Sequence, residues 1–246
     1  MTRPFEVDRQ LEVAAAPEQA WDVITTGDGM DGWFMGRNEI TPGVGGTVKT
    51  VSPAFTEEAK ITAWEPPTRF AYRGDELEDG TVHQFEYQIE PRPNGSSIRW
   101  LHTGVLGPDW ESTYEAMSEG DPMYFQKLAE YLTYFYPRKA TVVDAFGPNI
   151  PDHERVWETL RPALGLTGPV NLDDRLRLTP EGLDVIDGVV DWVSPNMLGV
   201  RTEDALYRFI HGFEGTVMVG HHIYVPGLDQ KEQEEAWSSW MNKVFA

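Results

Sequence analysis

The sequence predicts an α+β fold in which a curved antiparallel sheet wraps around a long helix, followed by a second, abridged copy of the same arrangement. Two observations predict the sheet and its helix. Several short strand candidates follow one another with only turn residues between them, which is typical of an antiparallel meander. A long amphipathic segment then covers residues 121–137. A third observation predicts the copy, because residues 140–246 run through a similar order again.

The first half opens with a strand over residues 5–13, where apolar and polar side chains largely alternate. Pro17 and Glu18 then favour a helix start, because proline suits the first turn and acidic side chains suit its positive end. A short second helix is expected within residues 27–36. The turn at Asn94-Gly95 is a strong hairpin signal. The remaining strands are expected at residues 47–51, 58–64, 69–73, 82–90 and 97–105.

The long helix is predicted to begin at Asp121, as the N-cap residue, with Pro122 in its first turn. Its apolar stripe would face the sheet and comprises Tyr124, Phe125, Leu128, Tyr131, Leu132 and Phe135. Residues 107–120 are interpreted as a loop with large apolar side chains. Such a loop suits a lid over a cavity, or equally a cover for the interface with the second half.

The second half is predicted to contain a strand at 141–146, a helix at 151–164, strands at 175–178, 185–192, 198–201, 206–213 and 216–225, and a last helix at 230–245. One motif supports the duplication: Trp64, Pro67 and Arg73 have the same spacing as Trp192, Pro195 and Arg201. We therefore expect two domains, at residues 1–138 and 139–246.

Charge and composition limit the function classes. The formal net charge is −20, with 20 Lys and Arg against 40 Asp and Glu. Such a surface repels nucleic-acid backbones and anionic lipid headgroups, so neither is expected as a partner. The absence of cysteine excludes disulfides and thiolate chemistry. Without an apolar targeting segment at the N-terminus, a cytoplasmic protein is expected.

Several motifs, taken in order, resemble the SRPBCC (START-like, Bet v 1-like) superfamily, and within it the family of activator of Hsp90 ATPase homologue 1. They are the helix start at residues 14–21, Trp33-Phe34, the strand start at 45–48, the hairpin at 60–72 and the segment 94–104. The resemblance covers about residues 1–137. It implies a helix-grip fold with a cavity between helix and sheet. The superfamily includes carriers, cyclases and chaperone regulators, so function has to be argued from the site.

Nine residues are predicted to line that cavity: two inward-facing aromatics of the short second helix, residues that share a face of a strand, and residues of the long helix stripe. For the strand at 97–105, apolar residues on both faces leave open which face meets the helix. They are Trp33, Phe34, Tyr72, Phe85, Tyr87, Trp100, His102, Phe125 and Leu128. Aromatic walls would supply contact area, and His102 or a tyrosine hydroxyl would orient a ligand. The alternative is that these side chains simply fill the core.

The favoured function is the binding of a small hydrophobic or aromatic molecule without evident catalysis. His83 and His102 could act as acid and base, but the sequence pairs neither with an acid. No catalytic residue, metal or cofactor is therefore assigned; His221-His222 point to opposite faces of a strand. Two alternatives remain: a cavity enzyme of cyclase or hydrolase type, and a protein-interaction module such as a co-chaperone or stress-response regulator. A histidine with a shifted pKa beside an acid would favour the enzyme.

Overall fold

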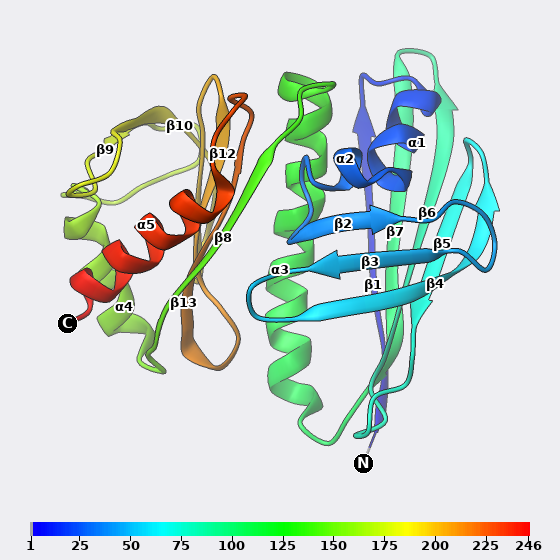
Figure 1. Ribbon diagram of the computed structural model, residues 1–246, viewed down its shortest axis with the longest axis horizontal. Coiled ribbons are helices and arrows are strands. Elements are labelled where there is room, and N and C mark those ends of the chain that lie inside the picture. The colour runs from blue at the N-terminus through cyan, green and yellow to red at the C-terminus, as the bar shows by residue number, and fades with distance from the viewer. Residues whose placement is uncertain (1) are drawn as a thin grey trace. The chain divides into compact units, whose positions relative to one another are not determined.

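The computed structural model describes residues 2–246 and divides the chain into two compact units, Met1–Lys139 and Ala140–Ala246. Each unit contains one antiparallel sheet with helices packed on it (Figure 1). The predicted α+β class is confirmed. No helix among residues 2–246 is long and apolar enough to cross a membrane.

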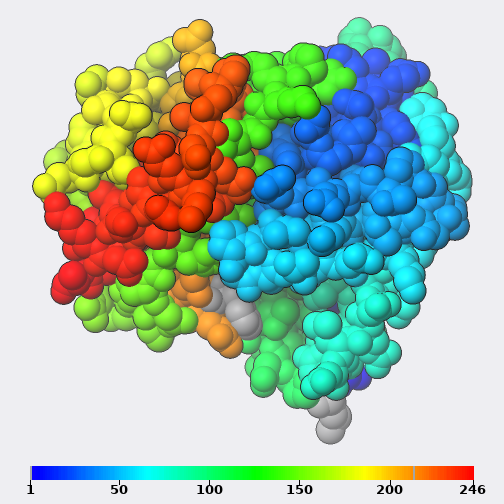
Figure 2. Space-filling model, viewed as in Figure 1, coloured from blue at the N-terminus to red at the C-terminus, as the bar shows by residue number. Residues whose placement is uncertain are grey.

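The sheet of the first unit has seven strands in the order β1-β7-β6-β5-β4-β3-β2, all paired antiparallel. Their bounds are β1 Arg3–Val13, β2 Arg37–Ile40, β3 Thr47–Val51, β4 Thr56–Glu65, β5 Arg69–Gly74, β6 Val82–Arg92 and β7 Gly95–Leu106. Strand β2 was not predicted, because its exposed Arg37 and Glu39 give it no apolar face. In the space-filling view, side chains of β2, β3 and β4 cover the near face of this unit (Figure 2).

Helices α1 (Pro17–Thr25) and α2 (Gly27–Met30) connect β1 to β2, and α3 (Trp110–Glu130) follows β7 and continues into a π-helical turn at Tyr131–Phe135. The predicted start at Asp121 and the predicted loop before it are wrong. The helix begins at Trp110 and places Asp121 in its middle. Residues 110–119 contain strong helix formers, Glu, Ala and Met, and one interior proline interrupts the backbone hydrogen bonds only locally.

The core of the first unit is aromatic and lies between the sheet and its helices. Tyr87 and Trp100 are cross-strand neighbours whose rings stack with an interplanar angle of 8°. The indole of Trp33 packs edge-on against both rings, and its Nε1 donates a hydrogen bond to the carbonyl of Val23 in α1, 3.0 Å away. This end of the sheet is thereby closed by α1 and by the segment after α2.

The second unit has a six-stranded sheet in the order β8-β13-β12-β11-β10-β9. The strands are β8 Thr141–Asn149, β9 Arg175–Leu178, β10 Ile186–Ser194, β11 Met197–Arg201, β12 Ala205–His211 and β13 Thr216–Ile223, with helices α4 His153–Ala163 and α5 Gln230–Val244. In both sheets the first strand pairs with the last, and the others run back in chain order. Phe209, Trp237 and Trp240 fill the space between this sheet and its helices.

Candidate ligand cavity of the first unit

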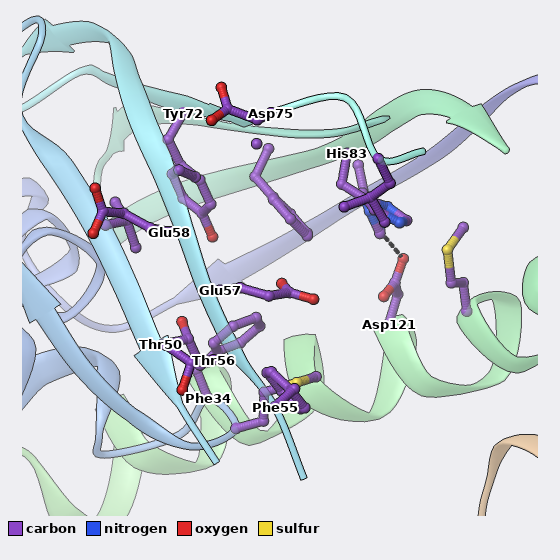
Figure 3. Close-up of a pocket in the computed structure, with 18 residues that line it drawn as sticks. Phe34, Thr50, Phe55, Thr56, Glu57, Glu58, Tyr72, Asp75, His83 and Asp121 are labelled. Carbon is purple, nitrogen blue, oxygen red and sulfur yellow. Dashed lines mark hydrogen bonds and ion pairs between the residues drawn. The ribbon is translucent and has the colours of Figure 1, made fainter. Parts of the chain in front are cut away.

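A cavity of about 410 Å³ lies between the sheet of the first unit and α3 (Figure 3). Strands β3 to β7, the segment after α2, the loop after β5 and one face of α3 contribute its walls. Its apolar and aromatic lining residues are Phe34, Met35, Val48, Phe55, Ala59, Tyr72, Leu77, Phe85 and Met117, together with Gly74. The polar ones are Thr50, Thr56, Glu57, Glu58, Asp75, His83, His102 and Asp121.

Four of the nine residues predicted to line a cavity do so: Phe34, Tyr72, Phe85 and His102. The other five do not lie on its wall and are buried in the adjacent core: Trp33, Tyr87, Trp100, Phe125 and Leu128. The difference is position along the strand rather than the face of the sheet. On β6, His83, Phe85 and Tyr87 share a face, but only the first two lie beyond the core that Trp33 and α1 close.

Three polar side chains from three elements form a hydrogen-bonded chain at one side of the cavity. His102 Nδ1 on β7 lies 2.7 Å from Asp121 Oδ2 on α3, and His102 Nε2 lies 3.0 Å from His83 Nδ1 on β6. An ionised carboxylate only accepts, so His102 donates from Nδ1. In a neutral His102 ring, Nε2 then accepts the hydrogen that His83 carries on Nδ1. That assignment leaves His83 Nε2 as a proton acceptor.

Aromatic rings shield this chain from water. The Phe85 ring stacks on His102 with centroids 4.0 Å apart, and Phe5 packs edge-on against both histidines. Burial lowers the pKa of His83 to about 4, helped by the nearby His102, while Asp121 and Asp79 oppose the shift. His83 is therefore a neutral ring at physiological pH.

Glu57 enters the cavity from the opposite wall, on β4 (Figure 3). Solvent still reaches its side chain through the open side of the cavity. The surrounding protein nevertheless removes part of the water around the carboxylate and so raises the pKa of Glu57, with His102 acting in the opposite direction. Burial likewise raises the pKa of the Tyr72 hydroxyl on the neighbouring strand.

A buried hydrogen-bond network holds the wall that carries Phe34 and Met35. Asp31 Oδ1 accepts from the backbone N–H of Asn38 at 2.6 Å and from its side-chain amide at 3.1 Å. Asn38 in turn accepts from the hydroxyl of Thr50 at 2.8 Å. Burial raises the pKa of Asp31 to about 6, although both bonds from Asn38 lower it. The network closes the segment between α2 and β2 onto β3.

Asp121 and Glu57 are the important residues that sequence reasoning missed. A signal existed for each. Asp121 lies three and four positions before Tyr124 and Phe125, so it shares the buried stripe of the helix. Glu57 alternates onto the same face of its strand as Ala59 and Ile61. Both carboxylates could have been expected to point inward.

The described part of the chain contains no group of three or more His, Asp and Glu side chains arranged to hold a metal ion. In the second unit, His221 Nδ1 accepts from the backbone N–H of Arg208 at 3.0 Å, and His211 Nε2 contacts the carbonyl of Ile150 at 2.8 Å. Both histidines thus contact main-chain groups, which is a structural role.

Comparison with protein families places a match in the first unit. Residues 4–119 match the family described as polyketide cyclase / dehydrase and lipid transport. No curated protein matches the chain. Similar solved structures include protein MLL2253 from Mesorhizobium loti, with 23% identity and a TM-score of 0.46, covering 53% of this chain and 96% of that one. Protein BH1534 from Bacillus halodurans has 22% identity and a TM-score of 0.45, covering 54% and 99%. The Aha1 dimer from Colwellia psychrerythraea has 20% identity and a TM-score of 0.44, covering 52% and 96%.

Proposed function

Since the first unit carries a domain of the SRPBCC superfamily, we propose that its cavity binds one small, largely aromatic molecule. The observation that carries the proposal is the cavity itself. Its volume of about 410 Å³ falls within the range of about 300–1,000 Å³ usual for small-molecule sites. Apolar and aromatic walls that carry a small number of polar groups are typical of such sites.

The composition of the walls limits the kind of ligand. Phe34, Tyr72 and Phe85 present aromatic surface, which favours a flat ring system. The 18 lining residues include Glu57, Glu58, Asp75 and Asp121 but no Lys or Arg. A carboxylate or phosphate ligand would meet like charges without a counter-ion. An anionic ligand is therefore disfavoured.

The test is a fluorescence titration with aminoanthracene, a neutral aromatic probe whose emission rises in apolar surroundings. Saturable binding is expected for the native protein. Ala59→Phe places a ring in the cavity, and should weaken binding at least about tenfold, which corresponds to about 1.4 kcal/mol. Thr62→Phe is the matched control, because Thr62 is exposed on the same strand. Absence of saturable binding, or equal binding by both variants, would contradict the proposal.

One observation favours a cavity enzyme as the second candidate function. The cavity contains a histidine with a displaced pKa, hydrogen-bonded through a second histidine to a carboxylate. Such an arrangement is common where a protein moves a proton to or from a bound molecule. The favoured and alternative functions therefore share one site and differ in whether the bound molecule is changed.

A further inference from the structure

We propose that Asp121, His102 and His83 form a proton relay that takes the proton of a weakly acidic hydroxyl, a phenol or an enol, on the molecule bound in the cavity. This inference rests on the proposed binding function and specifies its ligand class. The three residues come from α3, β7 and β6, and all three line the cavity.

The order of the three groups gives the relay a direction. Asp121 Oδ2 lies 2.7 Å from His102 Nδ1 at one end of the chain, and His102 Nε2 lies 3.0 Å from His83 Nδ1 at the other. The other ring nitrogen of His83, Nε2, makes no hydrogen bond to any residue within 2–246. It is therefore the acceptor that the relay presents to a bound molecule.

The proton transfer balances without any further reactant. The O–H bond of the ligand breaks, and its proton joins His83 Nε2. His83 releases the hydrogen on Nδ1 to His102 Nε2, so His83 stays neutral. His102 becomes an imidazolium that remains hydrogen-bonded to the Asp121 carboxylate, and the ligand retains the electron pair as an oxyanion. His83, now protonated at Nε2, donates a hydrogen bond to that oxyanion.

Burial explains why the relay needs two histidines. A positive charge on His83 is disfavoured, because its surroundings hold its pKa near 4. On His102 the same charge lies beside Asp121, within hydrogen-bond distance of an opposite charge. Four other ionisable groups interact electrostatically with the relay: Asp79 with His83, Glu57 with His102, and the Tyr72 and Tyr87 hydroxyls with Asp121. Asp79 and Glu57 are acidic and favour the protonated relay.

The walls select a phenol or enol over other proton donors. A carboxylic acid is already ionised at neutral pH and would enter as an anion among four lining carboxylates. A phenol or enol enters neutral, and the ring of a phenol stacks on aromatic walls. An ammonium group would suit the carboxylates, but loss of its proton leaves a neutral amine, which gains less than an oxyanion does from the hydrogen bond that His83 donates. A flat ring that carries a weakly acidic hydroxyl suits both parts of the cavity: the ring contacts the aromatic walls, and the hydroxyl meets the relay.

The experiment uses para-nitrophenol, whose ionised form has its own visible absorption band, and para-nitroanisole, its methyl ether without the acidic hydrogen. Calorimetry measures binding of both compounds. At a pH where free para-nitrophenol is mostly protonated, binding to the native protein should increase the nitrophenolate band. In Asp121→Asn, the amide oxygen still accepts from His102 but the charge is lost. We expect the ratio of ionised to neutral bound phenol to fall about tenfold.

Two further variants keep the test interpretable. His83→Gln removes the proton acceptor at the His83 end of the chain and leaves the His102–Asp121 pair intact, so it should also lose the nitrophenolate band. His153→Gln, a histidine of the second unit, should behave as the native protein. If para-nitroanisole and para-nitrophenol both bind but the band is absent or unchanged in Asp121→Asn, the relay is wrong and the binding function stands. If neither compound binds, both proposals fail.

Discussion

Phe85 and His102 are directly opposite each other on β6 and β7, and their rings stack at 4.0 Å with an interplanar angle of 19°. This pair joins the aromatic wall of the cavity to its polar side. A ligand ring placed against Phe85 would have its polar group near His83, the next inward-facing residue along β6. The stack thereby sets the expected orientation of the ligand.

Phe85→Ala should weaken aminoanthracene binding about tenfold or more, because it removes one aromatic wall. Phe85 is only partly buried, so the free energy of unfolding should fall by less than for a core residue. Trp100→Ala is the comparison, since Trp100 is 1% exposed and does not line the cavity. It should cost about 3–5 kcal/mol of stability. Urea denaturation and probe titration of both variants measure the two effects separately; a larger binding loss for Trp100→Ala would contradict the assignment.

Asn38→Ala should destabilise the protein by about 1–3 kcal/mol, because it leaves buried partners at Asp31 and Thr50 unsatisfied. Binding of the probe should weaken as well, since the network holds the segment that carries Phe34. Asn242→Ala provides the control: Asn242 is exposed on α5 and makes one side-chain hydrogen bond, to Ser238. Equal thermal stability of the two variants would refute the structural role of Asn38.

His83 should make stability depend on pH. Its pKa is about 4 in the folded protein against an ordinary value of 6.5, so between these values the unfolded chain binds a proton that the folded protein does not. The free energy of unfolding therefore falls as pH decreases from about 6.5 to 4, by at most about 3 kcal/mol. The raised pKa of Asp31 has the opposite effect on stability below pH 6. Because Asp31 is present in both the native protein and His83→Gln, its effect cancels when the two are compared.

Chemical denaturation at several pH values measures that difference. The stability of His83→Gln relative to the native protein should rise as pH falls through this window. Parallel curves for the two proteins would show that His83 is not held in its neutral form.

In the second unit, Asp191→Ala should be strongly destabilising. Asp191 accepts two hydrogen bonds from the guanidinium of Arg208, at 3.0 and 2.7 Å, and the two side chains are 4% and 0% exposed. Removing one partner leaves a buried charge, which costs about 3–5 kcal/mol. The matched variant is Asp187→Ala, because Asp187 lies on the same strand as Asp191 but forms an exposed ion pair, with Arg177. It should cost at most about 1 kcal/mol. Similar denaturation midpoints for the two variants would contradict the buried ion pair.

Much of the fold could be predicted, because the strands are short, alternate clearly and are separated by strong turn residues. The long helix was misplaced at its start because Asp121-Pro122 has the composition of a helix N-terminus, and local sequence does not reveal that the helix continues through it. That the second unit is an abridged copy of the first stays a prediction, which the matching strand orders support.

The cavity was harder to predict than the fold. Alternation identifies which residues share a face of a strand: it placed Phe85 and Tyr87 inward, but it left open which face of the next strand, the one with Trp100 and His102 or the opposite one, points toward the helix. It does not show where along the strand the core ends and the cavity begins, which depends on where α1 and Trp33 pack. The partnership of His102 with Asp121 joins two residues 19 positions apart on different elements and depends on the register of α3 against β7. No local pattern contains that information.

The most direct measurement of ligand binding in the cavity is methyl NMR of the protein with labelled methionines, titrated with para-nitroanisole. The chain has 8 methionines, and two of them, Met35 and Met117, line the cavity from different elements. An aromatic ligand in the cavity should shift both methyl signals through its ring current and leave those of Met197 and Met241, in the second unit, unchanged. Saturable shifts confined to methionines of the first unit, with Met35 and Met117 the most affected, are predicted. Shifts at Met197 or Met241 alone, or no shift at all, would contradict a ligand site in this cavity.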